Sequence, residues 1–136
     1  VEKAGTMYVT GPEVVKTVLG EEISFEDLGG AMTHGTKSGV AHFVAKNEYE
    51  CMDYIKTLLS YIPQNNSEAP PSVKPSDDPN RLDNNLINIV PEDSLKPYDM
   101  KEIIHSILDD NTFFEIHELF AQNVIVGFGR MNGKTI

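Results

Sequence analysis

The chain of 136 residues has no tryptophan, one cysteine, and only 11 lysines and arginines against 21 aspartates and glutamates. The single cysteine, Cys51, excludes an internal disulfide and fits a reducing compartment. A net charge of -10 disfavours nucleic acid as a partner, because phosphate contacts need clustered basic side chains. No run of about 18 apolar residues is present, so the sequence predicts no membrane-spanning helix. The apolar share of 40% nevertheless suits a globular chain.

Glycine and proline are each missing from long stretches of the chain. No glycine lies between residues 40 and 126, and seven of the eight prolines fall within residues 63–97. Residues 63–85 are rich in Pro, Asn, Ser and Asp and have little to bury, so we expect an extended connecting arm. This division predicts two structural parts, residues 1–68 and 69–136.

The part before the arm alternates predicted strands and helices. Alternating β-branched and aromatic residues indicate strands at Thr6–Gly11 and Val40–Asn47. Pro12 suits the first position of a short helix over Glu13–Val18, because its fixed φ is already helical.

Two capping boxes predict the starts of further helices. Ser24 is followed three residues later by Asp27, and Asn47 is followed by Glu50. We expect the first of these helices to end at Gly29-Gly30, where a positive φ costs least. The second carries an apolar face at spacings of three and four and ends before the first proline of the arm; the face comprises Cys51, Ile55, Leu58, Leu59 and Ile62.

After the arm, the sequence predicts a helix capped by Asp99, with an apolar stripe formed by Met100, Ile103, Ile104, Ile107 and Leu108. The stretch "TFFEIHELF" is ambiguous between strand and helix. Residues 123–136 predict a hairpin, because Asn132-Gly133 suits a type I′ turn. The second hairpin strand is short and the chain lacks an initiator Met, so we expect an internal fragment of a longer protein.

Candidate chemistry is concentrated in the glycine-rich stretch over residues 29–39. Gly29 and Gly30 either aim two backbone N–H groups at an oxyanion or end a helix, and a helix cap is the commoner outcome. His34 has no Cys or carboxylate at metal-ligand spacing, so no metal site is predicted. Ser38 has no base at the spacing of a known catalytic triad.

The remaining histidines indicate structural positions. We expect His42 to be hydrogen-bonded within a strand and His105 to flank the apolar stripe of its helix. His117, in "EIHELF", lacks the second His of a helical zinc motif. The residues taken alone therefore predict an α/β fragment without a self-sufficient active site.

Five strings, in order, resemble one family: "TGPEVVKTVLGEEISFEDLGGAMTHGTKSGVAH", "DDPNRL", "IVPEDSLKPYDMKEIIHSILDD", "FFEI" and "NVIVGFGRMNGKTI". The chain is similar, over essentially its whole length, to the carboxyltransferase (β) subunits of biotin-dependent acyl-CoA carboxylases. The similarity is greatest to the propionyl-CoA carboxylase and methylmalonyl-CoA carboxyltransferase type. Related subunits also act in decarboxylases.

The resemblance implies an α/β fold of the crotonase-like β-β-α superhelix class. Residues 1–68 would be the C-terminal part of an N-terminal, acyl-CoA-binding domain. Residues 69–136 would be the connecting arm and the first elements of a C-terminal, carboxybiotin-binding domain. The implied reaction moves a carboxyl group from carboxybiotin to the α carbon of an acyl-CoA. Propionyl-CoA is the expected substrate, with acetyl-, butyryl- and methylmalonyl-CoA left open.

The resemblance also implies partners and a compartment. It implies biotin on a separate carrier, a biotin carboxylase subunit, no metal, and a dimer-based hexamer of the parent subunit. The location would be the cytoplasm of a bacterium or the mitochondrial matrix of a eukaryote. The family's own oxyanion loops, Ser-Gly-Gly-Ala-Arg and Gly-Gly-Ala-Tyr, do not occur in this chain, so we expect it to be inactive alone.

The resemblance gives Gly29-Gly30-Ala31 a different place from those loops and favours the helix cap. Residues that could approach acyl-CoA or a subunit interface lie in the same stretch: Gly29, Gly30, His34, Ser38 and Gly39. One alternative is a non-catalytic crotonase-like fragment that serves assembly or interaction only. Another is a free-standing enzyme that uses His34 and Ser38.

Overall fold

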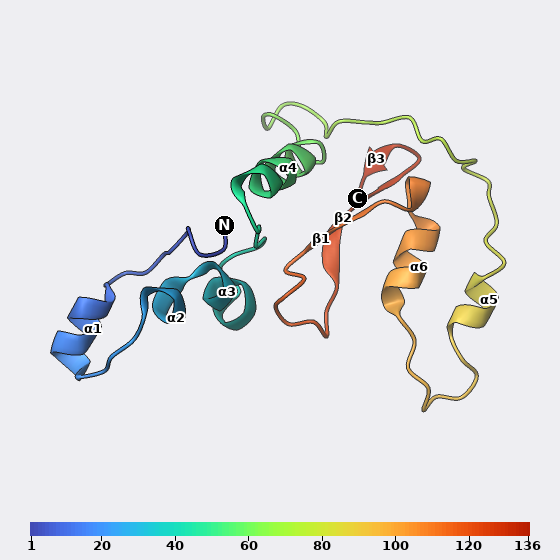
Figure 1. The fold of residues 1–136 in the computed structure, drawn as a ribbon. Helices are drawn as coiled ribbons and strands as arrows, with labels where there is room; N and C mark the ends of the chain where they lie inside the picture. Colours follow the sequence, from blue (N-terminus) through green and yellow to red (C-terminus); the bar gives the residue numbers. More distant parts are fainter. The chain divides into compact units, whose positions relative to one another are not determined.

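The computed structural model describes residues 1–136, and Figure 1 shows the course of the chain. The chain forms two compact units. Unit 1 contains Val1–Lys56 and Ile116–Val126, and unit 2 contains Thr57–Glu115 and Gly127–Ile136. Short helices together with a three-stranded sheet make the protein α/β, as the sequence predicts.

The first two predicted helices of unit 1 are confirmed. Helix α1, Pro12–Leu19, begins with its proline and ends at Gly20, which has a φ of 72°. Helix α2, Phe25–Gly29, is capped by Ser24, whose hydroxyl accepts a hydrogen bond from the Asp27 N–H at 3.0 Å. The serine cap stabilises such a short helix because it satisfies an N–H that has no partner within the helix.

Helix α2 ends at Gly29-Gly30 as predicted, but the reason given for the glycines is wrong. Gly30 has a φ of -73°, so no left-handed residue is needed there. The glycines are required by space instead: a Cβ on Gly29 would meet the Met7 carbonyl, and one on Gly30 would lie 2.6 Å from the Glu26 carbonyl oxygen. The chain then continues through α3, Ala31–Thr33, into the π-helical turn η1, which spans residues 34–38.

Neither predicted strand of unit 1 forms. Residues 6–11 make one isolated bridge, between Thr6 and Gly30. Residues 40–47 accept backbone hydrogen bonds from two different segments, at Ala45 and at His42, rather than from one neighbouring strand. An alternating pattern sets which side chains share a face, but a strand also needs a second strand along its length. Unit 1 provides no second strand along the length of either segment.

Helix α4, Glu48–Leu59, starts at the predicted capping residues. The Asn47 side-chain oxygen accepts from the Glu50 N–H at 3.0 Å, and the Glu50 carboxylate accepts from the Lys46 N–H at 2.5 Å. Part of the expected apolar face remains exposed, since Leu59 keeps 57% of its accessible surface. At 12 residues α4 is the longest helix, and none of the helices is long and apolar enough to cross a membrane.

The arm in unit 2 is extended but is held by hydrogen bonds along its length. The Val73 N–H donates to the Gly133 carbonyl at 3.0 Å, and the Ser76 N–H donates to the Asp110 carboxylate at 3.1 Å. Further along, Arg81 donates from one guanidinium nitrogen to the carbonyls of Ser106 (2.9 Å) and Leu108 (2.7 Å). The arm leads into α5, Leu86–Ile89, a single turn that the sequence does not predict.

The predicted helix after the arm is confirmed. Helix α6, Met100–Ile107, is capped by Asp99, whose side chain accepts from the Lys101 N–H at 2.8 Å. A 3-10 turn, η2, Asp109–Asn111, follows it.

The predicted hairpin is also confirmed, and it lies in a sheet ordered β1-β2-β3. The ambiguous stretch contains β1, Phe113–Ile116; the hairpin pairs β2, Val126–Met131, with β3, Lys134–Thr135, in antiparallel register. Asn132 and Gly133 have φ values of 49° and 78°, the two positive angles that a type I′ turn requires.

Aromatic rings form the centre of unit 2. Tyr61, only 4% exposed, stacks on Phe114 with centroids 6.0 Å apart and on Phe128 with centroids 5.6 Å apart. The Arg130 guanidinium carbon lies 4.1 Å from the Tyr61 ring centroid, and the same group donates to the Ser60 carbonyl at 2.7 Å. The arginine therefore ties β2 to the segment that follows α4.

Candidate functional site

The stretch over residues 29–39 is built on the end of helix α2. The Gly30 N–H donates to the Glu26 carbonyl at 2.8 Å, and the Gly29 carbonyl accepts from the Met7 N–H at 2.8 Å. An oxyanion hole needs N–H groups left open toward the reacting oxygen. The Gly30 amide is already engaged, so this glycine pair ends a helix and does not bind an oxyanion.

His34 bonds through both ring nitrogens. Its Nε2 lies 2.5 Å from the Met7 carbonyl oxygen, and its Nδ1 lies 2.8 Å from the Ser38 hydroxyl oxygen. A carbonyl oxygen only accepts, so we assign the proton of the neutral ring to Nε2. The Nδ1 atom then has a lone pair and accepts the hydrogen bond that the Ser38 hydroxyl donates.

Ser38 is thus hydrogen-bonded to a histidine, although its spacing from His34 is not that of a known catalytic triad. The side chain of Ser38 is exposed, and its oxygen also receives a long hydrogen bond, 3.3 Å, from the Val40 N–H. The turn η1 brings His34 and Ser38 together because residues four apart lie on one face of a helical turn. That spacing is present in the sequence and is the signal that could have identified the pair.

Two glycines fit this turn closely against neighbouring side chains of unit 1. Gly35 is buried, and a Cβ there would collide with Val44. Gly39 has a φ of 66°, and a Cβ there would lie 2.6 Å from the ring of Phe120. The close packing on both sides fixes the backbone that carries His34 and Ser38.

The other histidines take part in structural contacts. The rings of His42 and His117 have centroids 4.3 Å apart, and the His42 carbonyl accepts from the His117 N–H at 3.1 Å. His105 donates from Nδ1 to the Asn111 carbonyl at 2.8 Å. No group of three or more His, Cys, Asp or Glu residues is arranged to hold a metal ion.

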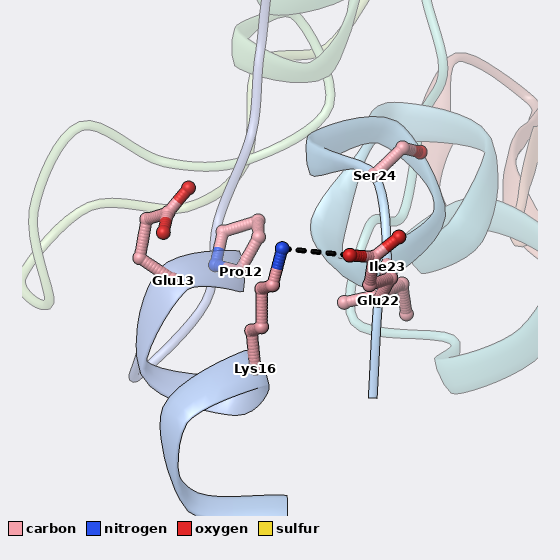
Figure 2. Close-up of a pocket in the computed structure, with 6 residues that line it drawn as sticks. All are labelled: Pro12, Glu13, Lys16, Glu22, Ile23 and Ser24. Atoms are coloured by element: carbon pink, nitrogen blue, oxygen red, sulfur yellow. Dashed lines mark ion pairs between the residues drawn. The ribbon is translucent and has the colours of Figure 1, made fainter. Parts of the chain in front are cut away.

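A hollow of about 380 Å³ lies between α1 and the residues that precede α2. Figure 2 shows six residues that line it. The Lys16 ammonium reaches across it to the Glu22 carboxylate, 2.6 Å away. Both side chains are more than half exposed, so this ion pair adds little stability. A larger hollow of about 590 Å³ lies in unit 2 and is lined by Asp83, Asn85, Ile89, Asp99, Lys101, Glu102, His105, Ser106 and Asn111.

Hydrogen bonds to two carboxylates stabilise their charged forms. The side-chain hydrogen bond from Ser76 is the main cause that holds the pKa of Asp110 below its usual value. The hydroxyl of Ser106 donates to Asp83 at 2.5 Å and lowers the pKa of that carboxyl in the same way. The two pairs join the arm to α6 and to the turn η2, and each hydrogen bond favours the ionised carboxylate.

Comparison with known proteins decides the family. The family model described as the carboxyl transferase domain matches residues 1–136, the whole chain. The chain belongs to the carboxyl transferase domain family. The resemblance drawn from the five strings is thereby confirmed.

Relatives in this family carry the names that the resemblance predicts. A propionyl-CoA carboxylase carboxyltransferase subunit of Haloferax mediterranei is 51% identical over 130 residues, which are 96% of this chain and 25% of the relative. The methylmalonyl-CoA decarboxylase subunit alpha of Veillonella parvula is 44% identical over the whole chain and 27% of the relative. The human mitochondrial propionyl-CoA carboxylase beta chain is 42% identical over the whole chain and 25% of the relative. The chain thus spans about a quarter of the length of these proteins.

A solved structure of transcarboxylase 12S matches the fold with a TM-score of 0.92 and 38% identity. The match covers 96% of this chain and 26% of the other. That structure is described as a hexamer assembly with hydrolyzed methylmalonyl-coenzyme A bound.

Proposed function

We propose that this chain is part of an acyl-CoA carboxyltransferase that moves a carboxyl group from carboxybiotin to the α carbon of an acyl-CoA. Propionyl-CoA is the acyl-CoA we propose, because two of the relatives described above are named for propionyl-CoA carboxylase. The observation that carries the proposal is the family match over all 136 residues together with 51% identity to one such subunit.

We further propose that the parent has the crotonase-like fold and two domains. Residues 1–68 end the acyl-CoA domain, and residues 69–136 form the arm and the first elements of the carboxybiotin domain. The distribution of proline and glycine supports this division, because the arm is the proline-rich segment. We place the parent in the bacterial cytoplasm or the mitochondrial matrix.

The partners in this proposal are those that the family resemblance implies. We propose that the parent subunit forms a hexamer, as the transcarboxylase 12S structure is described, and works with a biotin carboxylase and a biotin carrier. Several large apolar side chains of this chain are fully or largely exposed, including Val9 at 103%, Leu82 at 90% and Leu95 at 90%. Burial against further parts of such an assembly would remove this apolar surface from water.

Gly29 and Gly30 do not form a site for biotin or for an acyl-CoA enolate, because the Gly30 N–H already donates to the Glu26 carbonyl. We therefore assign no catalytic step to this glycine pair. The contribution of the chain that the structure supports is a scaffold: a capped helix, a fixed turn, and an arm held by Asp110 and Arg81.

A chimera tests the proposal. Residues 1–136 replace the matching quarter of the Haloferax mediterranei subunit. The chimera is then combined with the biotin carboxylase and the biotin carrier of Haloferax mediterranei. We expect ATP-dependent carboxylation of propionyl-CoA above that of a chimera in which the same residues are placed in scrambled order. A soluble, assembled chimera without carboxylation would contradict the proposal. The 136-residue chain alone is expected to show none.

A further inference from the structure

The turn η1 carries an arrangement to which the proposed carboxyl transfer assigns no role. An exposed serine hydroxyl donates to a histidine nitrogen, and the other nitrogen of that ring is held by a carbonyl. We propose that Ser38 is a nucleophile, activated by His34, that accepts an acyl group from an activated ester or thioester. This activity goes beyond the proposed carboxyl transfer and does not rest on it.

The geometry of His34 is that of a base held in place. A general base must lie within about 2.6–3.2 Å of the proton it removes, and His34 Nδ1 lies 2.8 Å from the Ser38 oxygen. A third group must orient the base, and the Met7 carbonyl does so at 2.5 Å from Nε2. This bond fixes the tautomer in which Nδ1 is free to take the serine proton.

Access and rigidity also favour Ser38. Its side chain is exposed, so an acyl donor can reach it, while the next residue, Gly39, is packed against the Phe120 ring. Other hydroxyls nearby lack such a base. Thr36, in the same turn, donates to the Met32 backbone carbonyl at 2.8 Å.

The acyl transfer needs only Ser38, His34 and the acyl donor. The Ser38 oxygen attacks the acyl carbonyl carbon as its proton passes to His34 Nδ1. The tetrahedral intermediate expels the thiolate or alkoxide, which takes that proton from His34 and leaves as a thiol or alcohol. The product is an acyl ester on Ser38. Water, with His34 again as base, can hydrolyse this ester to the free acid.

Acylation by p-nitrophenyl acetate tests the proposal on the 136-residue chain. This probe contains no CoA, so its outcome is separate from that of the chimera assay. Released p-nitrophenol gives the rate, and peptide mass spectrometry locates the acetyl group. The variants are Ser38→Ala, His34→Gln and, as a matched control in the same turn, Thr36→Ala. Glutamine at position 34 keeps a donor for Met7 but supplies no basic nitrogen.

We expect acetyl on Ser38 in the native chain and in Thr36→Ala, and none at this site in Ser38→Ala. His34→Gln should slow acylation of Ser38 by about 10²- to 10⁴-fold, the usual contribution of a general base. Far-UV circular dichroism of each variant shows whether its helices are retained. Equal rates in the native chain and His34→Gln would overturn the proposal, as would acetyl found only on lysine side chains such as Lys37.

Discussion

Replacing Asp109 tests how the turn η2, which follows helix α6, is joined to the hairpin. Asp109 is 7% exposed, and its carboxylate accepts from the Asn132 N–H at 2.9 Å and from the Gly133 N–H at 2.6 Å. The variant Asp109→Ala leaves two amide groups of the hairpin turn without an acceptor. An unsatisfied buried donor such as the Gly133 N–H costs about 1–3 kcal/mol, and loss of the more exposed bond from the Asn132 N–H adds about 1 kcal/mol, so we expect local opening to become easier by about 2–4 kcal/mol.

Hydrogen exchange at the amides of Asn132 and Gly133, followed by NMR, measures this opening directly. A change of about 2–4 kcal/mol corresponds to roughly 30- to 700-fold faster exchange, because every 1.4 kcal/mol is tenfold. Asp109→Asn keeps one carbonyl oxygen and should give an intermediate rate. The control Asp93→Ala removes a carboxylate that accepts only from the exposed Leu95 N–H in a different turn. Unchanged exchange in Asp109→Ala would refute the role given to this carboxylate.

Three further predictions concern other contacts. Gly39→Ala should destabilise unit 1 by about 2 kcal/mol, measured by urea unfolding, because it adds left-handed strain and a clash with Phe120; equal stability would contradict this. Arg130→Lys should lower the free energy of unfolding by about 1–2 kcal/mol, because an ammonium replaces the guanidinium over the Tyr61 ring. A double-mutant cycle with Tyr61→Leu measures the coupling between the two side chains, and zero coupling would contradict this role. The hydrogen bond from Ser76 holds the pKa of Asp110 below its usual value, so the stabilisation is fully present above the unfolded-state pKa and is lost as the pH falls through the lower folded pKa. Urea unfolding at a series of acid pH values measures this loss, and the same pH dependence in Asp110→Asn would contradict it.

The sequence was sufficient where the signal is local. Ser24, Asp99 and the Asn132-Gly133 turn act through hydrogen bonds or backbone angles within three residues, and all three are found where predicted. The resemblance of the five strings to a carboxyltransferase family was also sufficient for the family.

The sequence was insufficient where a distant partner decides the outcome. Residues 6–11 alternate as a strand should, yet no second strand runs beside them, and only Thr6 forms a bridge. The need for glycine at position 29 comes from the Met7 carbonyl, 22 residues away along the chain, and not from a positive φ. The orientation of His34 depends on Met7, 27 residues away, which no local pattern reveals.

The most direct test of the proposed carboxyl transfer is the position of the new carboxyl group in the product. The chimera that carries residues 1–136, with its biotin carboxylase and biotin carrier, is supplied with ATP, ¹³C-bicarbonate and propionyl-CoA, and the thioester is examined by NMR. The account predicts a labelled carboxyl on the α carbon of the propionyl group. An assembled chimera whose thioester stays unlabelled, while the native subunit labels it, would contradict the account.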